Sequence, residues 1–328
     1  MHGIIDEAHR VMKIFTTSGI SIVILTVGTD ERIRYLDQLL KSIERQTVKS
    51  FELIIASETS KGRLEDLLRK YFPSNEDCRI LVAGYWNKCK TANKAIKEAK
   101  GGIIFLLEDD LVLKENFIEE MLKTFDLDSK IGCVYSQCIW IYPEGLRSKG
   151  GIKGFVARLI SKLSIHESVL PRHVKKIDEY LYEVPVFTMS VACRKDVLLK
   201  IGLYDESVNE PISGEDYDLA LRIRRSGYKI VQNVKAVSYH HTRQVSKKLS
   251  HLSTNPEYLR GLNKSEVYFI VKNRNMLGSC STLLHVAYRI LESIAWASRT
   301  RRPSTLIYGV TGTIEGLAKG LMFKWQTN

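Results

Sequence analysis

The sequence predicts an α/β protein with a doubly wound, mostly parallel sheet and a C-terminal helical extension. Apolar, β-branched runs alternate with segments whose apolar residues recur at helical spacing, which is typical of strand–helix–strand units. The predicted strands are 20–27, 51–56, 79–83 and 103–107, and the helices between them are 31–46, 63–71 and 87–99. Right-handed crossovers in such a sheet bring the carboxyl ends of the parallel strands to one edge.

Three consecutive carboxylates, Glu108, Asp109 and Asp110, follow the most apolar of these strands. An unpaired buried carboxylate costs several kcal/mol, so these groups must reach water, a cation or a ligand. Ser57 and Glu58 follow another strand, and we expect them at the same edge, where open α/β sheets bind ligands. The pattern favours a hard divalent cation that holds phosphate oxygens. The alternative is a solvated acidic turn.

Composition narrows the class of protein and of partner. The 328 residues, 44% hydrophobic and 26% charged, are ordinary for a soluble globular protein. The net charge of +12 indicates nucleic acid, anionic lipid or a phosphorylated substrate as partner, but no nucleic-acid-binding module is recognisable. Six scattered cysteines without a C-x-x-C pair argue against zinc or a disulfide framework. The cysteine usage, together with the lack of a recognisable secretory signal and of a long apolar run, predicts a cytoplasmic protein.

The second half of the chain contains a further acidic segment. A predicted helix at 212–227 opens on Glu215 and Asp216 and ends at Gly227. Ser213 and Asp216 also have capping-box spacing, so the acids are either a helix cap or functional groups. The strand at 229–237 is followed by Tyr239-His240-His241, whose histidines are either ligands or merely exposed. A basic, glycine-rich loop at 143–151 is either a mobile cover for an anionic ligand or a plain surface loop.

Five stretches in this order resemble the inverting family 2 glycosyltransferases, whose fold is called GT-A. They are the opening strand with its helix to Gln46, the strand and acidic loop at 51–60, the Glu108-Asp109-Asp110 counterpart of the D-x-D motif, the Gly214-Glu215-Asp216-Tyr217-Asp218-Leu219-Ala220-Leu221-Arg222…Gly227 box, and the histidine segment 239–241. The Glu-Asp box is long and specific. The D-x-D counterpart alone is weak.

The resemblance implies an enzyme that transfers a hexosyl group from a nucleotide-diphosphate sugar to a hydroxyl of a glycan or a lipid-linked saccharide. It implies that Asp216 is the general base, with Glu215 beside it, and that a divalent cation, manganese or magnesium, binds Asp110, Glu108 and His240. The donor-binding residues that it implies are Thr26, Ser57, Glu58, Lys90, Glu108 and Asp109. Two positions depart from the family pattern, because Ser57 and Glu108 stand where the family usually has aspartates.

The resemblance also suggests a division of the chain. We expect an N-terminal arm at 1–19, a nucleotide-sugar-binding half at 20–135, an acceptor and catalytic half at 136–263, and C-terminal amphipathic helices at 264–328. Apolar faces flanked by arginine and tryptophan suit the membrane interface, which would place the enzyme on the inner face of the cell membrane. The alternative is packing on the sheet domain or in a homo-oligomer.

Two other functions remain open from the sequence. A nucleotidyltransferase could use a similar sheet, although it would lack the Glu-Asp helix. A protein that has lost catalysis could use its positive charge to bind a membrane surface or nucleic acid.

Overall fold

The computed structural model describes residues 19–58, 62–73, 76–84, 87–141, 174–187, 190–208, 211–241 and 255–324. They divide into two compact units, which are described separately. The first is built from 1–141, 175–204 and 222–242, and the second from 142–174, 205–221 and 243–328, as far as each is described. The predicted N-terminal arm and the glycine-rich loop at 143–151 lie almost wholly outside the described residues.

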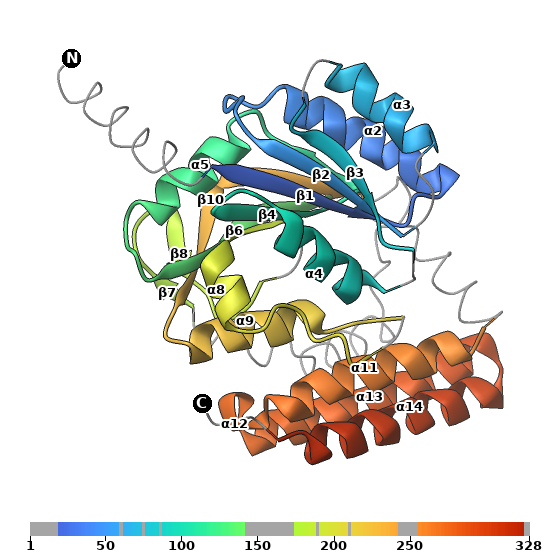
Figure 1. The fold of residues 1–328 in the computed structure, drawn as a ribbon. Coiled ribbons are helices and arrows are strands. Elements are labelled where there is room, and N and C mark those ends of the chain that lie inside the picture. The colour runs from blue at the N-terminus through green and yellow to red at the C-terminus, as the bar shows by residue number, and fades with distance from the viewer. Residues whose placement is uncertain are drawn as a thin grey trace. The chain divides into compact units, whose positions relative to one another are not determined.

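The first unit begins with the predicted parallel sheet (Figure 1). Strands β1 (Ile20–Thr26), β2 (Glu52–Ser57), β3 (Cys78–Val82) and β4 (Ile103–Glu108) are parallel, in the order β3-β2-β1-β4. Helices α2 (Asp30–Glu44) and α3 (Gly62–Tyr71) cover one face, and α4 (Lys88–Glu98) covers the other. The doubly wound prediction is therefore confirmed.

The sheet continues with strands that add antiparallel pairs. Its remaining order is β9 (Val191–Arg194), β6 (Ile131–Ile141), β10 (Lys229–His241), β8 (Leu181–Glu183) and β7 (Lys175–Lys176). The short β5 (Leu111–Leu113) pairs antiparallel with the end of β10. Helices α5 (Phe117–Phe125) and α8 (Lys195–Lys200) complete this unit.

Helix α9 (Glu215–Arg225) carries the Glu-Asp box and runs from the second unit into the first. Its C-terminal end is the predicted glycine cap. Gly227 has a φ of +85°, and the amides of Gly227 and Tyr228 donate to the carbonyls of Arg224 and Ile223. These two bonds are a Schellman motif, which requires a left-handed residue at this position.

The predicted C-terminal helices form the rest of the second unit. They are α11 (Glu257–Lys272), α12 (Arg274–Leu277), α13 (Ser279–Thr300) and α14 (Pro303–Met322). Helix α14 packs against α11 and α13. A row of glycines on α14 makes this approach close, because an added Cβ would lie within 3.0 Å of atoms of α11 or α13 at each of Gly309, Gly312, Gly316 and Gly320.

The cysteine spacing argued against a disulfide framework, and it gave no sign of the disulfide that the structure contains. Cys133 of β6 and Cys193 of β9 form a disulfide, although 60 positions separate them in sequence. They are register partners in adjacent antiparallel strands, with Cα atoms 4.2 Å apart. Sequence spacing could not show this pair, because the strand order of the sheet brings the two residues together.

We predict that Gly312→Ala destabilises the protein by about 1–3 kcal/mol, as expected for an overpacked contact. The added Cβ would lie 2.2 Å from the carbonyl oxygen of Arg260, a backbone atom that cannot move alone. Denaturant unfolding measures the change. Gly62→Ala is the matched control, because nothing lies within 4 Å of its Cβ position, and it should stay within about 0.5 kcal/mol of the unmodified protein. Equal stability of the two variants would contradict the close packing of α14.

Candidate functional site

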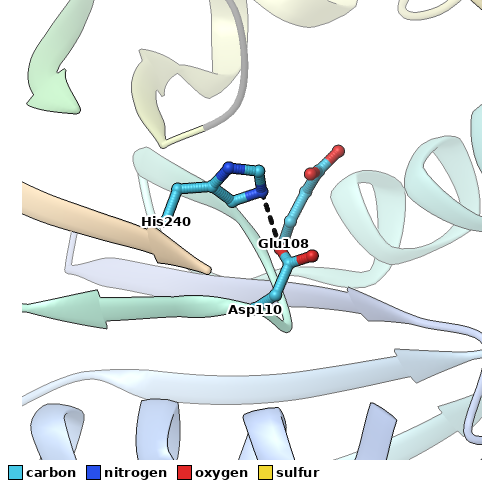
Figure 2. Close-up of side chains that lie close together, drawn as sticks. All are labelled: Glu108, Asp110 and His240. Atoms are coloured by element: carbon cyan, nitrogen blue, oxygen red, sulfur yellow. Dashed lines mark ion pairs between the residues drawn. The ribbon is translucent and has the colours of Figure 1, made fainter. Parts of the chain in front are cut away.

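Three of the predicted metal-binding side chains come together in the first unit (Figure 2). Glu108 ends β4, Asp110 precedes β5, and His240 lies opposite Leu111 in the β5–β10 ladder. Each of these three residues offers one ligand atom, and the three atoms all lie within 4.8 Å of one another. The antiparallel pairing of β5 with β10 is what carries His240 to the acidic turn. The imidazole Nε2 lies 3.2 Å from Asp110 Oδ1.

Arg32, in the first turn of α2, neutralises part of this acidic turn. Its guanidinium lies 2.5 Å from Asp109 Oδ1 and 2.6 Å from Asp110 Oδ2. Burial raises the pKa of Asp109 to about 6, against the opposing charge of Arg32. Burial acts in the same direction on Asp110, but the neighbouring His240 imidazole and the charge of Arg32 outweigh it and lower the pKa of Asp110. Asp110 is therefore the buried carboxylate that this surrounding holds ionised.

The donor atoms of the cluster fit a hard divalent cation. Asp110 Oδ1 is buried. It faces the His240 imidazole, but no described residue donates a well-aligned hydrogen bond to it. A buried carboxylate oxygen without a hydrogen-bond donor is costly unless a cation approaches it. Two carboxylates and an imidazole are ligands that manganese accepts, and magnesium also binds such oxygen-rich sites.

Asp109 and Thr26 are joined to each other. The Thr26 hydroxyl donates to Asp109 Oδ2 at 2.5 Å and accepts from the Gly28 amide at 3.0 Å. Asp109 is fully buried, and both of its oxygens contact Arg32. These contacts tie the end of β1 to the acidic turn after β4. The donor-binding role expected of Asp109 and Thr26 stays a prediction.

The remaining donor-side residues lie at the carboxyl ends of neighbouring strands, as predicted. Ser57 is the register partner of Thr26, and the Glu58 amide donates to the Thr26 carbonyl at 3.2 Å. Lys90 is in the first turn of α4, where its amide donates to the Asn87 side chain. Ser57 and Glu58 are both buried.

Sequence reasoning missed two cations of this site, Arg32 and Lys88. Lys88 Nζ lies 2.7 Å from Glu108 Oε1. Both residues occur in the first turn of a helix that follows a parallel strand, and such turns begin at the carboxyl edge of the sheet. That position was a usable signal in the sequence.

The predicted base, Asp216, is half-buried in the first turn of α9, and Glu215 beside it is buried. The capping-box alternative is wrong. Gly214, not Ser213, is the residue whose carbonyl accepts the first helical hydrogen bond, from the Asp218 amide at 3.0 Å. The Ser213 hydroxyl instead donates to Glu266 Oε2 on α11 at 3.0 Å. Gly214 takes this place with a φ of +92°.

Comparison with known proteins finds one family model that matches part of this chain. Residues 21–151 match the model of glycosyl transferase family 2. Chondroitin synthase of Pasteurella multocida is 28% identical over 111 residues, which are 34% of this chain and 12% of that protein. The match thus spans only about an eighth of that synthase. The uncharacterized glycosyltransferase MJ1057 of Methanocaldococcus jannaschii is 24% identical over 213 residues, 64% of this chain and 66% of that protein.

Two solved structures show the same fold. GalNAc-T7, solved with UDP, GalNAc and Mn²⁺, has a TM-score of 0.53 and 16% identity, over 87% of this chain and 58% of that one. The mannosyltransferase PcManGT of Pyrobaculum calidifontis, solved with GDP-Man and Mn²⁺, has a TM-score of 0.51 and 14% identity, over 96% of this chain and 92% of that one. The fold is therefore GT-A.

We predict that Asp110→Asn removes stabilisation of the protein by Mn²⁺, because the variant loses the buried anionic oxygen. A cation at 100 times its dissociation constant should raise the unfolding free energy of the unmodified protein by about 2.7 kcal/mol. Thermal unfolding with Mn²⁺ and with a chelator measures this difference. Asp37→Asn is the control, because Asp37 pairs with Lys70 at 2.8 Å outside the cluster, and it should keep the metal effect. An undiminished metal effect in Asp110→Asn would exclude this site.

Proposed function

We propose that this chain, whose residues 21–151 match the model of glycosyl transferase family 2, transfers a sugar from a nucleotide-diphosphate donor to an acceptor hydroxyl with inversion. The observation that carries the proposal is the cluster of Glu108, Asp110 and His240 at the carboxyl edge of the sheet. Open α/β sheets bind ligands at this edge, and GT-A neighbours of this chain were solved with nucleotides or nucleotide sugars and Mn²⁺.

A divalent cation, manganese or magnesium, would be held by Asp110, His240 and Glu108, and it would supply Lewis-acid neutralisation of the departing diphosphate. Lys88 already neutralises Glu108 from the side of α4. Thr26, Ser57, Glu58 and Lys90 would then contact the donor along the carboxyl ends of β1 and β2 and the start of α4. Lys90 is the cation of this group, and it suits a phosphate.

Asp216 is the proposed general base. Inversion needs a carboxylate that takes the proton of the acceptor hydroxyl while that oxygen attacks the anomeric carbon from the face opposite the leaving group. Because Gly214 supplies the first carbonyl of α9 and the Ser213 hydroxyl donates to Glu266, Ser213 and Asp216 do not form a capping box. This supports a chemical role for its carboxylate. Glu215, buried beside it, is proposed to support the same turn.

We predict that Asp216→Asn lowers turnover by at least about two decades while fold and donor binding persist, because a positioned base contributes that much. Turnover with a nucleotide sugar, thermal stability and donor affinity are measured together. Asp66→Asn, at an exposed position in the first half of α3, is the control and should keep full activity. Activity of Asp216→Asn within a few-fold of the unmodified protein would refute the assignment.

The acceptor is proposed to be a lipid-linked saccharide reached at a membrane surface. The faces of α13 and α14 support this part of the proposal. The buried residues of α13 are largely polar, namely Thr282, His285, Arg289, Ser293 and Trp296. Apart from Arg299 near the end of α13, the large residues that both helices expose are apolar: Leu283, Leu284, Leu291, Ile294, Ile307, Ile314, Leu321 and Met322. A water-facing amphipathic helix has the opposite arrangement, so these outer faces suit an apolar surrounding.

Basic and aromatic residues favour an anionic bilayer as that surrounding. Arg299, Arg301 and Arg302 are exposed where α13 ends and α14 begins, and the Arg299 guanidinium lies 5.3 Å from the Trp296 ring centre. Each basic residue near an anionic leaflet contributes roughly 1 kcal/mol. Among the described residues, none of the helices has the length and apolar content to cross a bilayer. The proposed association is therefore interfacial.

We predict that replacing Leu284, Ile294, Ile307 and Ile314 together by serine in the full chain abolishes sedimentation with phosphatidylglycerol vesicles. The change removes apolar side chains that are 47–64% exposed. The double variant Leu127→Ser/Leu199→Ser is the control, since these leucines are 63% and 47% exposed in the first unit, and it should still sediment. If neither the unmodified protein nor the variants sediment, and gel filtration shows a dimer that the quadruple variant breaks, these faces form a subunit interface instead.

A further inference from the structure

Lys272, the last residue of α11, is a buried cation between two carboxylates of the second unit. Its Nζ lies 2.7 Å from Asp205 Oδ2 and 3.0 Å from Asp218 Oδ1. The side chains of Lys272 and Asp218 are 3% and 0% exposed. Asn273 adds a hydrogen bond from Nδ2 to the same Asp218 oxygen at 2.8 Å. Removing one partner of such a buried set leaves an uncompensated charge, so α11 holds Asp218 firmly.

The middle of α11 holds the other end of the same turn. The Ser213 amide donates to Ser265 Oγ at 2.9 Å, and the Ser213 hydroxyl donates to Glu266 Oε2 at 3.0 Å. Between them and α9, Gly214 packs on α11, where an added Cβ would lie 3.4 Å from both Glu266 Cα and Phe269. The segment that leads into the Glu-Asp box is thus fixed to α11 by two hydrogen bonds and a close backbone contact.

Glu266 is itself fixed by α13. Its carboxylate lies 3.1 Å from His285 Nε2 and 3.6 Å from the Arg289 guanidinium. Burial alone would raise the pKa of Glu266, but the charge of Arg289 and the hydrogen bond with His285 lower it. Glu266 therefore remains an ionised acceptor for Ser213 at neutral pH. Hydrogen bonds to a charged group are stronger than those between neutral groups.

We propose that α11 is a clamp on the first turn of α9, and that Lys272 and Glu266 are positioning residues for Asp216. This inference rests on the proposed role of Asp216 as base. The contacts at Ser213 and at Asp218 lie on either side of Asp216 in the sequence, so together they fix the position and rotation of its turn. Displacing a reacting group by about 1 Å can cost on the order of 100-fold in rate. The clamp thus acts on turnover rather than on donor binding.

The test is a double-mutant cycle on turnover in the full chain. Lys272→Met should lower kcat at least about tenfold and leave the KM for the donor within about twofold, because the donor contacts are not altered. Lys272→Arg, which keeps the charge, should recover part of the loss. In an Asp216→Asn background, Lys272→Met should cause no further loss, since its effect passes through Asp216. A further tenfold loss in that background would overturn the clamp.

A control variant separates positioning from stability. Tyr268→Phe removes the hydrogen bonds of the Tyr268 hydroxyl, to Asp205 at 2.7 Å and from Ser207 at 3.2 Å, and keeps the contacts of Asp218 with Lys272 and Asn273. It should lower the melting temperature but keep kcat within about threefold. Ser213→Ala removes only the hydroxyl that donates to Glu266. It tests the Ser213 end of the clamp, also in the case that Lys272→Met does not fold. It should lower kcat several-fold and leave the KM for the donor unchanged.

The outcomes distinguish the clamp from the proposed function on which it rests. If Asp216→Asn keeps its activity, the base assignment fails and the clamp fails with it. If Asp216→Asn is inactive while Lys272→Met and Ser213→Ala keep the kcat of the unmodified protein, the base stands and the clamp is wrong. A loss of kcat in Tyr268→Phe equal to that in Lys272→Met would also overturn the clamp, because it would follow stability alone.

Discussion

The candidate site depends on the contact of Arg32 with Asp109 and Asp110. Three carboxylates in a row after a buried strand would repel one another and lose hydration. Arg32 pairs with two of them, and Thr26 donates to the fully buried Asp109. These contacts of Asp109 hold the acidic turn against β1 and α2. This leaves Glu108 and Asp110, on either side of it, free to face His240 with their remaining oxygens.

A similar logic of buried charge organises the second unit. Part of the contact between α11 and α13 is polar, because Glu266 pairs with His285 and Arg289, and Arg289 donates to Asn263. Isolated buried charges are costly, but these are paired and hydrogen-bonded, so they fix one arrangement of the helices. The glycines of α14 add a close approach that needs no side chains. The outer faces of α13 and α14 carry apolar side chains as well, and the proposed bilayer would cover them.

The sequence was sufficient for the parallel strands and for the residues at their carboxyl ends. Strand periodicity and the strand–helix order determine where Ser57, Thr26 and Glu108 lie, because those features are local. The pairs of Cys133 with Cys193, of Lys88 with Glu108, and of Ser213 with Glu266 depend on strand order and helix packing. A pattern within one segment cannot report such contacts. For the same reason the spacing of Ser213 and Asp216 wrongly indicated a capping box. The Ser213 hydroxyl has a stronger, charged partner, Glu266, on a helix distant in sequence.

The two departures from the family pattern have a physical reading in this structure. Glu108 has one methylene more than aspartate, and its carboxylate reaches Lys88 at 2.7 Å as well as the Asp110–His240 pair. The longer side chain thus pairs with Lys88 and also lies within reach of a cation at the Asp110–His240 pair. Ser57 is fully buried at the end of β2, between the register partner Thr26 and the buried Glu58. A carboxylate at this fully buried position would lose its hydration, so a neutral hydroxyl is the less costly group. On the proposed function, Ser57 would offer the nucleotide base a neutral hydrogen bond, and Lys90 and the cation would supply the positive charge that contacts the donor.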